Sequence, residues 1–272
     1  VLKLNPTAAL ICSPSYTHLE YLDFFLRNNK NILIEKPIYS KYDKEKFDNL
    51  LTKIKKKRNI IALVGYVLNY NTCLLKFFYK IKNNNLGKIL KVQADCNSYL
   101  PNWRKNIAYS DSNSAKKSYG GGVLLELSHE LDLALWLLST EITILSAVAN
   151  NSSLLKVDVE DQVIILAQSI DSTFITFRLN YCSQPPRRTV LVRSNEGELE
   201  CDVLAQNSRL NYPSSPSLTF SSSQVPDLRH RLQHKHFFAC IDRKELPLCT
   251  VSDGRAVLRM VRRISELADY SC

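Results

Sequence analysis

Hydrophobic positions in the first third of the chain alternate between two spacings. Apolar runs at residues 8–12, 31–35 and 59–66 have the length of short buried strands. Between them, residues 17–28 and 43–57 place apolar side chains three and four positions apart, the spacing of an amphipathic helix. Short strands that alternate with helices predict βαβ units and a parallel sheet.

The pattern changes near Gly87. Residues 88–100 alternate apolar and polar positions over a long stretch, and five shorter alternating runs follow, at residues 142–150, 161–170, 173–182, 187–195 and 197–205. Turn residues separate these runs, which predicts a large, mostly antiparallel sheet. We therefore expect an α/β fold with two domains, residues 1–87 and 88–272.

Helices are also expected in the second part. One should begin near Val123, after three glycines, and two more should cover residues 231–241 and 253–270. The Ser- and Pro-rich stretch at residues 207–226 is interpreted as a loop.

Composition narrows the class of protein. The chain has 272 residues, 45% of them hydrophobic and 23% charged, which is ordinary for a globular protein. No apolar run approaches the ~20 residues of a membrane span, and no signal peptide is visible. Eight scattered cysteines without a CxxC pair indicate reduced thiols rather than a metal site. We expect a cytoplasmic protein with no membrane partner and no bound metal.

The net charge of +10 raises the question of a nucleic-acid partner. The excess lies mainly in residues 41–58 and 76–91, and in the first of these stretches the lysines lie opposite an apolar stripe. The aromatic residues in these stretches do not interleave with the lysines in the way that a base-stacking surface would require. We therefore expect solvated helix faces and no nucleic-acid binding.

Two motifs follow the predicted parallel strands. CSPSYTH, ending at His18, stands where a strand ends and a helix begins, and its hydroxyls suit either helix capping or an anion. EKP, centred on Lys36, follows the next strand, and an ammonium at the carboxyl edge of a parallel sheet suits proton transfer to a bound substrate. A cis bond before Pro37 is possible.

A third motif, GGGVLLELSHELD, combines acids with a histidine. In one continuous helix Glu126, His129 and Asp132 would share a face, because they are spaced three apart. Such a polar stripe on an apolar helix is costly to bury without a function, although a satisfied core histidine would also fit.

Taken in order, SPSYTH, EKP, GY, LGKI and GGGVLLELSHELD closely resemble the Gfo/Idh/MocA family of oxidoreductases. The resemblance is specific over about residues 8–139 and looser to about 267. It implies a Rossmann domain, here partial, followed by an α+β domain whose open sheet often forms the oligomer interface. It also implies hydride transfer between NAD or NADP and a hydroxyl-bearing carbon of a sugar or polyol.

The resemblance assigns roles to individual residues. Lys36 and His129 match the catalytic lysine and histidine, with Glu126 as the acid beside them. The positions that line the cofactor are Ser13, Pro14, His18, Glu35, Lys36 and Pro37. Trp103, Arg104, Tyr109 and Asp132 would lie near the substrate, and Arg104 suits a carboxylate or phosphate. A loop packed by its tryptophan is an equal alternative for the segment around Trp103.

The sequence also departs from the family. None of its seven glycines, Gly65, Gly87, Gly120, Gly121, Gly122, Gly197 and Gly254, forms the GxGxxG turn that holds a pyrophosphate. We expect a fragment or processed product that binds NAD poorly by itself. Asn69 and Thr72 stand where relatives usually carry an Arg and a Pro, so a charge is lost.

The leading hypothesis is an NAD(P)-dependent oxidoreductase, or a fragment of one, acting on a sugar, sugar acid or nucleotide-sugar and assembling as a homo-oligomer. The alternative is a non-catalytic family descendant that serves as a binding or assembly module. The resemblance also leaves open glycoside cleavage by oxidation and elimination, which some family members catalyse with NAD.

Overall fold

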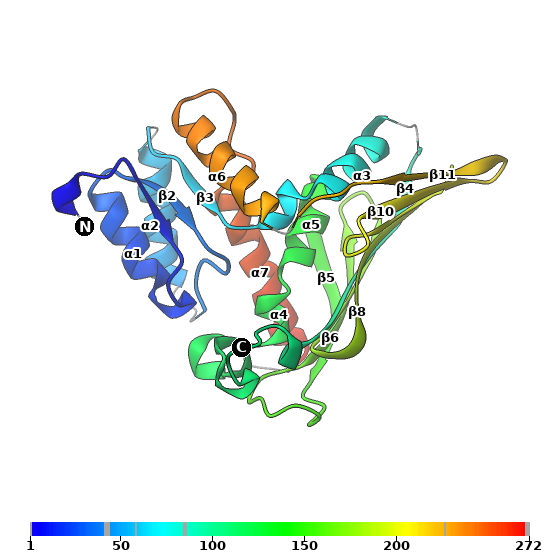
Figure 1. Ribbon diagram of the computed structural model, residues 1–272, viewed down its shortest axis with the longest axis horizontal. Coiled ribbons are helices and arrows are strands. Elements are labelled where there is room, and N and C mark those ends of the chain that lie inside the picture. Colours follow the sequence, from blue (N-terminus) through cyan, green and yellow to red (C-terminus); the bar gives the residue numbers. More distant parts are fainter. Residues whose placement is uncertain (1, 41–43, 58, 84–85, 226, 270–272) are drawn as a thin grey trace.

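The structure is a computed structural model that describes residues 2–40, 44–57, 59–83, 86–225 and 227–269. It contains a small parallel sheet and a large curved sheet, with helices between them (Figure 1). The predicted α/β class, with a parallel sheet followed by a mostly antiparallel one, is confirmed.

The small sheet consists of β1 (Ala8–Ile11), β2 (Asn31–Ile34) and β3 (Ala62–Val64), all parallel and in that order. Helices α1 (His18–Arg27) and α2 (Lys44–Lys56) connect these strands. Both elements match the predicted spacing, since the apolar stripes that contain Leu22 and Phe47 are buried. Within the described residues β1 pairs only with β2, so it is an edge strand.

The large sheet has the strand order β11-β10-β9-β8-β4-β7-β6-β5. Its strands are β4 (Ile89–Tyr99), β5 (Ile142–Asn150), β6 (Gln162–Ser169), β7 (Phe174–Asn180), β8 (Cys182–Ser194), β9 (Glu198–Asp202), β10 (Asn207–Tyr212) and β11 (Ser215–Ser221). Neighbouring strands are antiparallel except for β4 and β7, which run parallel.

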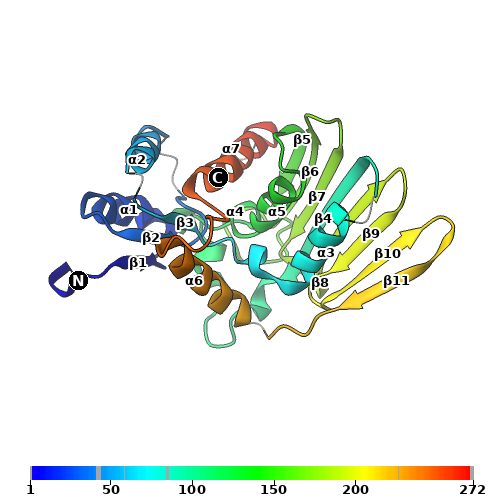
Figure 2. The ribbon, with the colours of Figure 1, turned by 90° about the horizontal axis from the view of Figure 1, so that it is seen from above.

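In the part of the chain that the structure describes, helices cover one face of the large sheet and leave the other open. They are α3 (Thr72–Asn83), α4 (Val123–Glu126), α5 (His129–Leu138) and α7 (Val251–Leu267), and they lie on the side that faces the small sheet (Figure 2). Strand β6 shows the consequence, because Val163 and Ile165 are buried whereas Ile164 and Leu166 are exposed. Alternation of this kind is typical of a sheet with one face packed and one face open.

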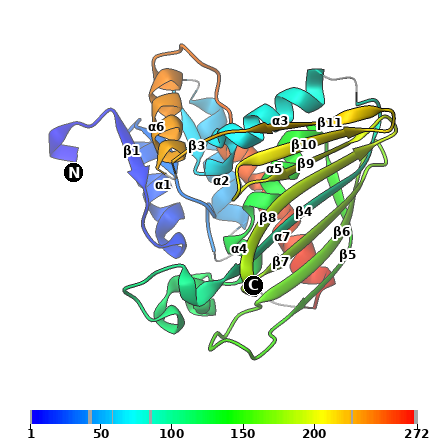
Figure 3. The same cartoon turned by 45° about the vertical axis from the view of Figure 1, so that its right-hand side comes forward.

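The chain returns to the small sheet near its end. Helix α6 (Leu228–Ile241) lies beside β3 (Figures 1 and 3), and Phe237 and Cys240 pack with Leu33 and Leu63 in a small apolar cluster. Residues from the last quarter of the sequence thus complete the packing around the first sheet. The domain division at residue 87 stays a prediction.

Two expectations about local structure are wrong. The predicted loop at residues 207–226 contains the hairpin β10–β11, which buries Ser208 and Leu210 and leaves β11 at the sheet edge, where a proline such as Pro216 is tolerated. The helix predicted from Val123 is broken into α4 and α5, and Ser128 Oγ donates to the Leu125 carbonyl at the break (2.8 Å).

No helix in the described part of the chain is long and apolar enough to cross a bilayer. Helix α3 was not expected from the sequence, although its apolar stripe, including Leu74 and Phe77, is buried.

The packing of α6 can be tested with two adjacent phenylalanines. Replacing buried Phe237 by alanine should lower the free energy of unfolding by about 3–5 kcal/mol, because the substitution leaves a cavity between α6 and the small sheet. Phe238→Ala is the matched control, since Phe238 is 52% exposed, and should cost less than about 1 kcal/mol. Urea unfolding followed by circular dichroism measures both, and equal effects would contradict the assigned packing.

Candidate active site

The carboxyl ends of the three parallel strands bring the first two motifs together. Cys12, Ser13 and Pro14 follow β1, and Glu35 follows β2. Gly65 follows β3, and a Cβ added there would lie 2.9 Å from Glu35 Oε2, so the Glu35 side chain lies across this glycine. In open α/β sheets this edge is where ligands bind.

His18 joins the two motifs instead of facing a ligand. It is buried, and its ring nitrogens lie 2.8 Å from the Pro37 carbonyl and 2.7 Å from the Ser13 carbonyl. Burial lowers the pKa of His18 in spite of these contacts. The Lys36–Pro37 bond is cis, as the sequence allowed. The His18 side chain therefore lies in the interior, beneath the residues that are predicted to contact the cofactor.

Lys36 connects the small sheet to the glycine-rich motif. Its Nζ donates to Glu126 Oε2 at 2.8 Å and to the Glu126 carbonyl at 2.9 Å, and its side chain is only 13% exposed. The two residues are 90 positions apart in the chain. This partly buried ion pair is therefore a tertiary contact between the predicted catalytic lysine and the predicted acid.

Glu126 also accepts a hydrogen bond from Ser114 Oγ (3.0 Å). Burial alone would raise the pKa of Glu126, but the charge and hydrogen bond of Lys36, with Ser114 and the nearby Arg104, hold it below its usual value. Glu126 is therefore a carboxylate at neutral pH, and Lys36 sits against a fixed negative charge.

The turn before α4 is held by Glu160. Its carboxylate accepts from the Leu124 amide (3.0 Å), and its carbonyl accepts from the Val123 amide (3.1 Å). Gly122 has φ +114, and a Cβ there would lie 2.5 Å from Glu160 Oε1, so only glycine fits. Burial raises the pKa of Glu160 to about 7. Through this turn Glu160 positions Glu126.

His129 begins α5, directly after the break. Its Nδ1 is buried and has no hydrogen-bond partner among the described residues, and the His129 and Tyr66 rings form a T-shaped contact with centroids 5.5 Å apart. Burial lowers the pKa of His129 well below its usual value, and Lys36, Arg188, Arg229 and His230 lower it further. The imidazole is therefore neutral at pH 7 and able to accept a proton.

Several residues near His129 were not singled out in the sequence. Arg188 of β8 forms a bidentate, buried pair with Glu130 (2.6 and 3.0 Å), next to His129 in the chain. Burial and the neighbouring Arg188 lower the pKa of Arg229, on α6. Glu130 belongs to the third motif, GGGVLLELSHELD. Only the packing of β8 and α6 brings Arg188 and Arg229 close to this motif.

The structure also brings the expected substrate residues together. Trp103, Arg104 and Tyr109 line one small pocket with Ser114, which binds Glu126. Two of them have structural contacts as well: Trp103 Nε1 donates to Ser98 Oγ (2.6 Å), and the Tyr109 hydroxyl accepts from the Lys156 amide (3.1 Å). Arg104 is exposed, and its charge acts on Glu126.

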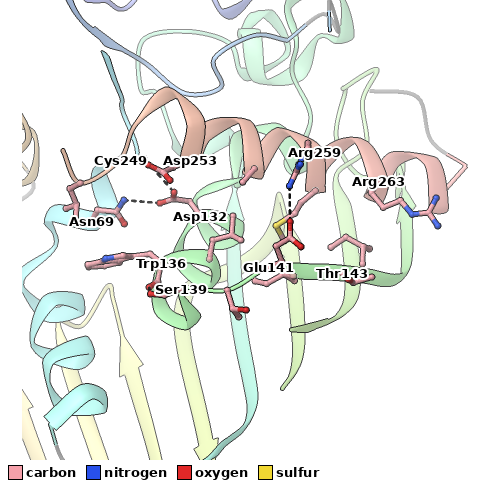
Figure 4. A pocket seen from close by; sticks show the side chains of 17 residues that line it. Asn69, Asp132, Trp136, Ser139, Glu141, Thr143, Cys249, Asp253, Arg259 and Arg263 are labelled. Carbon is pink, nitrogen blue, oxygen red and sulfur yellow. Dashed lines mark hydrogen bonds and ion pairs between the residues drawn. The ribbon is translucent and has the colours of Figure 1, made fainter. Parts of the chain in front are cut away.

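Asp132 lies elsewhere, which corrects the expectation of a shared face. It accepts from Asn69 Nδ2 (3.1 Å) and from the Cys249 thiol (3.8 Å), and neither Lys36 nor Glu126 is among its contacts. A cavity of about 740 Å³ lies beside it, between α5, β5 and α7 (Figure 4). The break between α4 and α5 explains the difference, because Glu126 and Asp132 do not belong to one helix.

The exposed surface at the carboxyl ends of the parallel strands suits the nicotinamide end of a dinucleotide. Cys12 and Pro14 are exposed there, Ser13, Glu35 and Lys36 are partly exposed, and Gly65 allows close approach of a ligand. These residues offer donors and acceptors for an amide and for ribose hydroxyls. No GxGxxG turn exists in the sequence to hold a pyrophosphate. Among the described residues, no three His, Cys, Asp or Glu side chains are grouped so as to hold a metal ion.

Comparison with known proteins identifies the class. Residues 2–66 match the model of an oxidoreductase family with an NAD-binding Rossmann fold, and residues 79–200 match the GFO/IDH/MocA C-terminal domain. The chain belongs to the Gfo/Idh/MocA family of NAD-binding oxidoreductases, as its motifs predicted. No curated protein sequence matches it.

Solved structures share the fold at low sequence identity. UDP-N-acetylglucosamine 3-dehydrogenase GnnA from Acidithiobacillus ferrooxidans is 16% identical, with a TM-score of 0.80 over 98% of this chain and 80% of that chain. Levoglucosan dehydrogenase in complex with NADH is 18% identical, with a TM-score of 0.84 over 96% of this chain and 77% of that chain. The WlbA dehydrogenase from Bordetella pertussis, in complex with NADH and UDP-GlcNAcA, is 15% identical, with a TM-score of 0.78 over 98% and 78%.

The buried carboxyl of Glu160 predicts a pH-dependent stability. Its folded pKa of about 7 exceeds the usual 4.5, so the unfolded chain releases this proton first as the pH rises. The contribution of Glu160 to the free energy of unfolding therefore falls between about pH 4.5 and 7, with a slope of at most about 1.4 kcal/mol per pH unit. Above pH 7 this contribution is constant. Glu160→Gln should remove this dependence, because an amide oxygen still accepts from Leu124.

Urea unfolding at pH 5, 6, 7 and 8 measures this effect. As the pH rises to about 7, the free energy of unfolding of the wild type should fall relative to that of Glu160→Gln. Above that pH the difference should stay constant. Glu20→Gln, at an exposed position of α1, is the control and should keep the wild-type slope. A slope for Glu160→Gln equal to that of the wild type would contradict the assignment.

Proposed function

We propose that the protein is an NAD(P)-dependent dehydrogenase that acts on a hydroxyl-bearing carbon of a sugar, sugar acid or nucleotide-sugar. The observation that carries the proposal is the Lys36–Glu126 ion pair (2.8 Å) beside a neutral His129. It combines a fixed cation and a proton acceptor at the carboxyl edge of a parallel sheet, where hydroxyl chemistry requires both.

Each residue has a distinct proposed role. Lys36, held by Glu126, donates a hydrogen bond to the reacting oxygen and stabilises negative charge there. His129 accepts or returns the hydroxyl proton, since its pKa keeps the ring neutral. Ser13, Pro14, Glu35 and Pro37 line the edge against which the nicotinamide would lie, and a bound NAD(P) would supply the hydride acceptor.

The charges around the site favour an anionic substrate. Arg104 acts on Glu126 from the pocket that contains Trp103, and Arg229 acts on His129 from α6. Guanidinium groups bind carboxylates and phosphates with two parallel hydrogen bonds. Two of the structurally similar proteins are named for, or solved with, UDP-linked sugars, which agrees with this proposal. We therefore favour a sugar acid or nucleotide-sugar over a neutral polyol.

Cofactor binding is the first test. NADH is titrated into the chain and into a version carrying an N-terminal strand–GxGxxG–helix segment, with nicotinamide fluorescence as the readout. Binding of NADH by the extended version alone supports a dehydrogenase that needs the GxGxxG segment to hold the pyrophosphate of the cofactor. Failure of both folded proteins to bind would favour a non-catalytic binding module instead.

The role of Lys36 predicts a large loss of activity. In the version that binds NAD⁺, Lys36→Met should reduce kcat by about 10²–10⁴-fold, because the reacting oxygen loses its charged donor. NADH formation is followed with a panel of sugar acids and UDP-sugars. Lys53→Met, at an exposed pair with Asp23, is the control and should keep wild-type kcat. Unchanged turnover of Lys36→Met would refute the proposed role.

We further propose that the open face of the large sheet is a homo-oligomer interface. Apolar side chains exposed there are Leu145, Val148, Ile164, Leu166 and Phe174. Ile164→Asp, at a position 61% exposed on β6, should lower the mass measured by light scattering, because it places a charge in an apolar contact. Leu246→Asp, in the loop before α7, is the control and should leave the mass unchanged. A monomeric wild-type protein would show the proposal to be wrong.

A further inference from the structure

The cavity beside Asp132 is separate from the Lys36 site and has charged groups at both ends. Its walls come from α5, β5, α7 and the residues that precede α7, and Asn69 closes one end (Figure 4). Asn69, Asp132 and Cys249 form what we call the acid end, together with Asp253. Arg259 and Arg263 lie further along α7 and form the arginine end (Figure 4).

The acid end has hydrogen-bond acceptors without a cation. Asp132 is buried, and its contacts are Asn69 Nδ2 and the Cys249 thiol, both uncharged. Asn69 is also buried, and its Oδ1 has no hydrogen-bond partner among the described residues. A buried acceptor without a donor is costly, so this end is suited to a ligand that donates hydrogen bonds.

The electrostatics of the acid end favour a cationic donor over a neutral one. The titratable groups with the main effects on Asp132, or coupled to it most clearly, are Tyr66, Tyr70, Cys249, Asp253 and Glu130, and none of these is a lysine, arginine or histidine. Burial raises the pKa of Asp132 to about 8, and the neighbouring carboxylates Asp253 and Glu130 contribute. Asp253 is already engaged, because its carboxylate caps α7 through Thr250. An incoming cation would bind Asp132 and displace its proton.

The arginine end suits an anion. Arg259 forms a long ion pair with Glu141 (3.5 Å), with both side chains well exposed, and Arg263 forms one with Glu266 (3.4 Å). Exposed pairs of this kind are weak, so a ligand carboxylate can compete for the arginines. Asp253 and Arg259 are six residues apart on α7, so they are offset by roughly 9 Å along the helix axis.

The lining also contains apolar side chains. They are Leu135, Ile142, Ile144, Ala256 and Met260, with Trp136 toward the acid end (Figure 4), and they are accompanied by the hydroxyls of Ser139, Thr140 and Thr143. A cavity of about 740 Å³ has the size of sites that hold small molecules. Along α7 itself, the lining changes from Asp253 through Ala256 to Arg259, Met260 and Arg263.

We propose that this cavity binds a small zwitterion, an ω-amino acid type of molecule, with its ammonium on Asp132 and Asn69 Oδ1 and its carboxylate on Arg259 and Arg263. The methylene chain lies along Trp136 and Met260. This site is independent of the proposed dehydrogenase reaction, because it shares none of its lining residues with the Lys36–Glu126 pair.

Isothermal titration calorimetry tests the proposal, with 6-aminohexanoate as the probe. Hexylamine, which lacks the carboxylate, and hexanoate, which lacks the ammonium, are the matched controls. At pH 7 the probe should bind with release of a proton, seen as a dependence of the heat on the ionisation enthalpy of the buffer, because Asp132 gives up its proton to pair with the ammonium. Both control compounds should bind at least about tenfold more weakly.

Two variants locate the binding. Asp132→Asn should weaken binding at least about tenfold and abolish the proton release. Ala256→Phe should block the cavity from α7 and leave Asp132 in place. Lys36→Met and the exposed Asp171→Asn are controls that should bind as the wild type does. Circular dichroism confirms that each variant is folded.

The possible outcomes separate clearly. Binding that is lost in both Asp132→Asn and Ala256→Phe supports the site. The absence of binding to the folded wild type overturns the proposal, and so does binding that survives in both variants. Equal affinity for hexylamine or for hexanoate overturns the zwitterion assignment, because one of the two ends would then contribute nothing.

Discussion

The candidate active site depends on the ion pair between Lys36 and Glu126. A lysine with a side chain that is only 13% exposed needs a fixed partner, and the carboxylate and carbonyl of Glu126 both supply one. The pair joins the end of β2 to the end of α4, and so links the small sheet to the segment that covers the large one. Loss of either partner would leave the other charge partly buried without compensation.

The pair depends in turn on the turn that precedes α4. Gly122 and the carboxylate of Glu160 fix the start of this one-turn helix, and Ser114 orients the free oxygen of Glu126. The break at Leu127–Ser128 then lets α5 start in a new direction with His129 as its first residue. Two short helices thus separate groups that one straight helix would have placed on one face: Glu126 faces Lys36, and Asp132 faces the cavity.

The positions of the charges divide the molecule into two polar regions. Around His129, burial lowers the pKa of the imidazole most, and Lys36 with three more basic side chains, Arg188, Arg229 and His230, lowers it further, so the ring is neutral. Around Asp132, burial raises the pKa of the carboxyl to about 8, and the neighbouring carboxylates Asp253 and Glu130 add to the effect. Tyr66 lies between the two regions, with its ring against His129 and its hydroxyl under the influence of Asp132. Groups three residues apart in the sequence therefore have opposite electrostatic surroundings.

The sequence alone determined the fold class, most of the elements and the family. Local spacing was sufficient, because apolar periodicity, glycines and the ordered motifs around Lys36 and His129 are properties of contiguous residues. Prediction from local spacing failed at residues 207–226, where turn-forming residues occur within a hairpin at the sheet edge. It also failed at Asp132, because helical spacing was extended across the break between α4 and α5. Only the tertiary structure decided which charges meet. Lys36 and Glu126 are separated by 90 positions, Glu130 and Arg188 by 58, and no local pattern encodes contacts of that range.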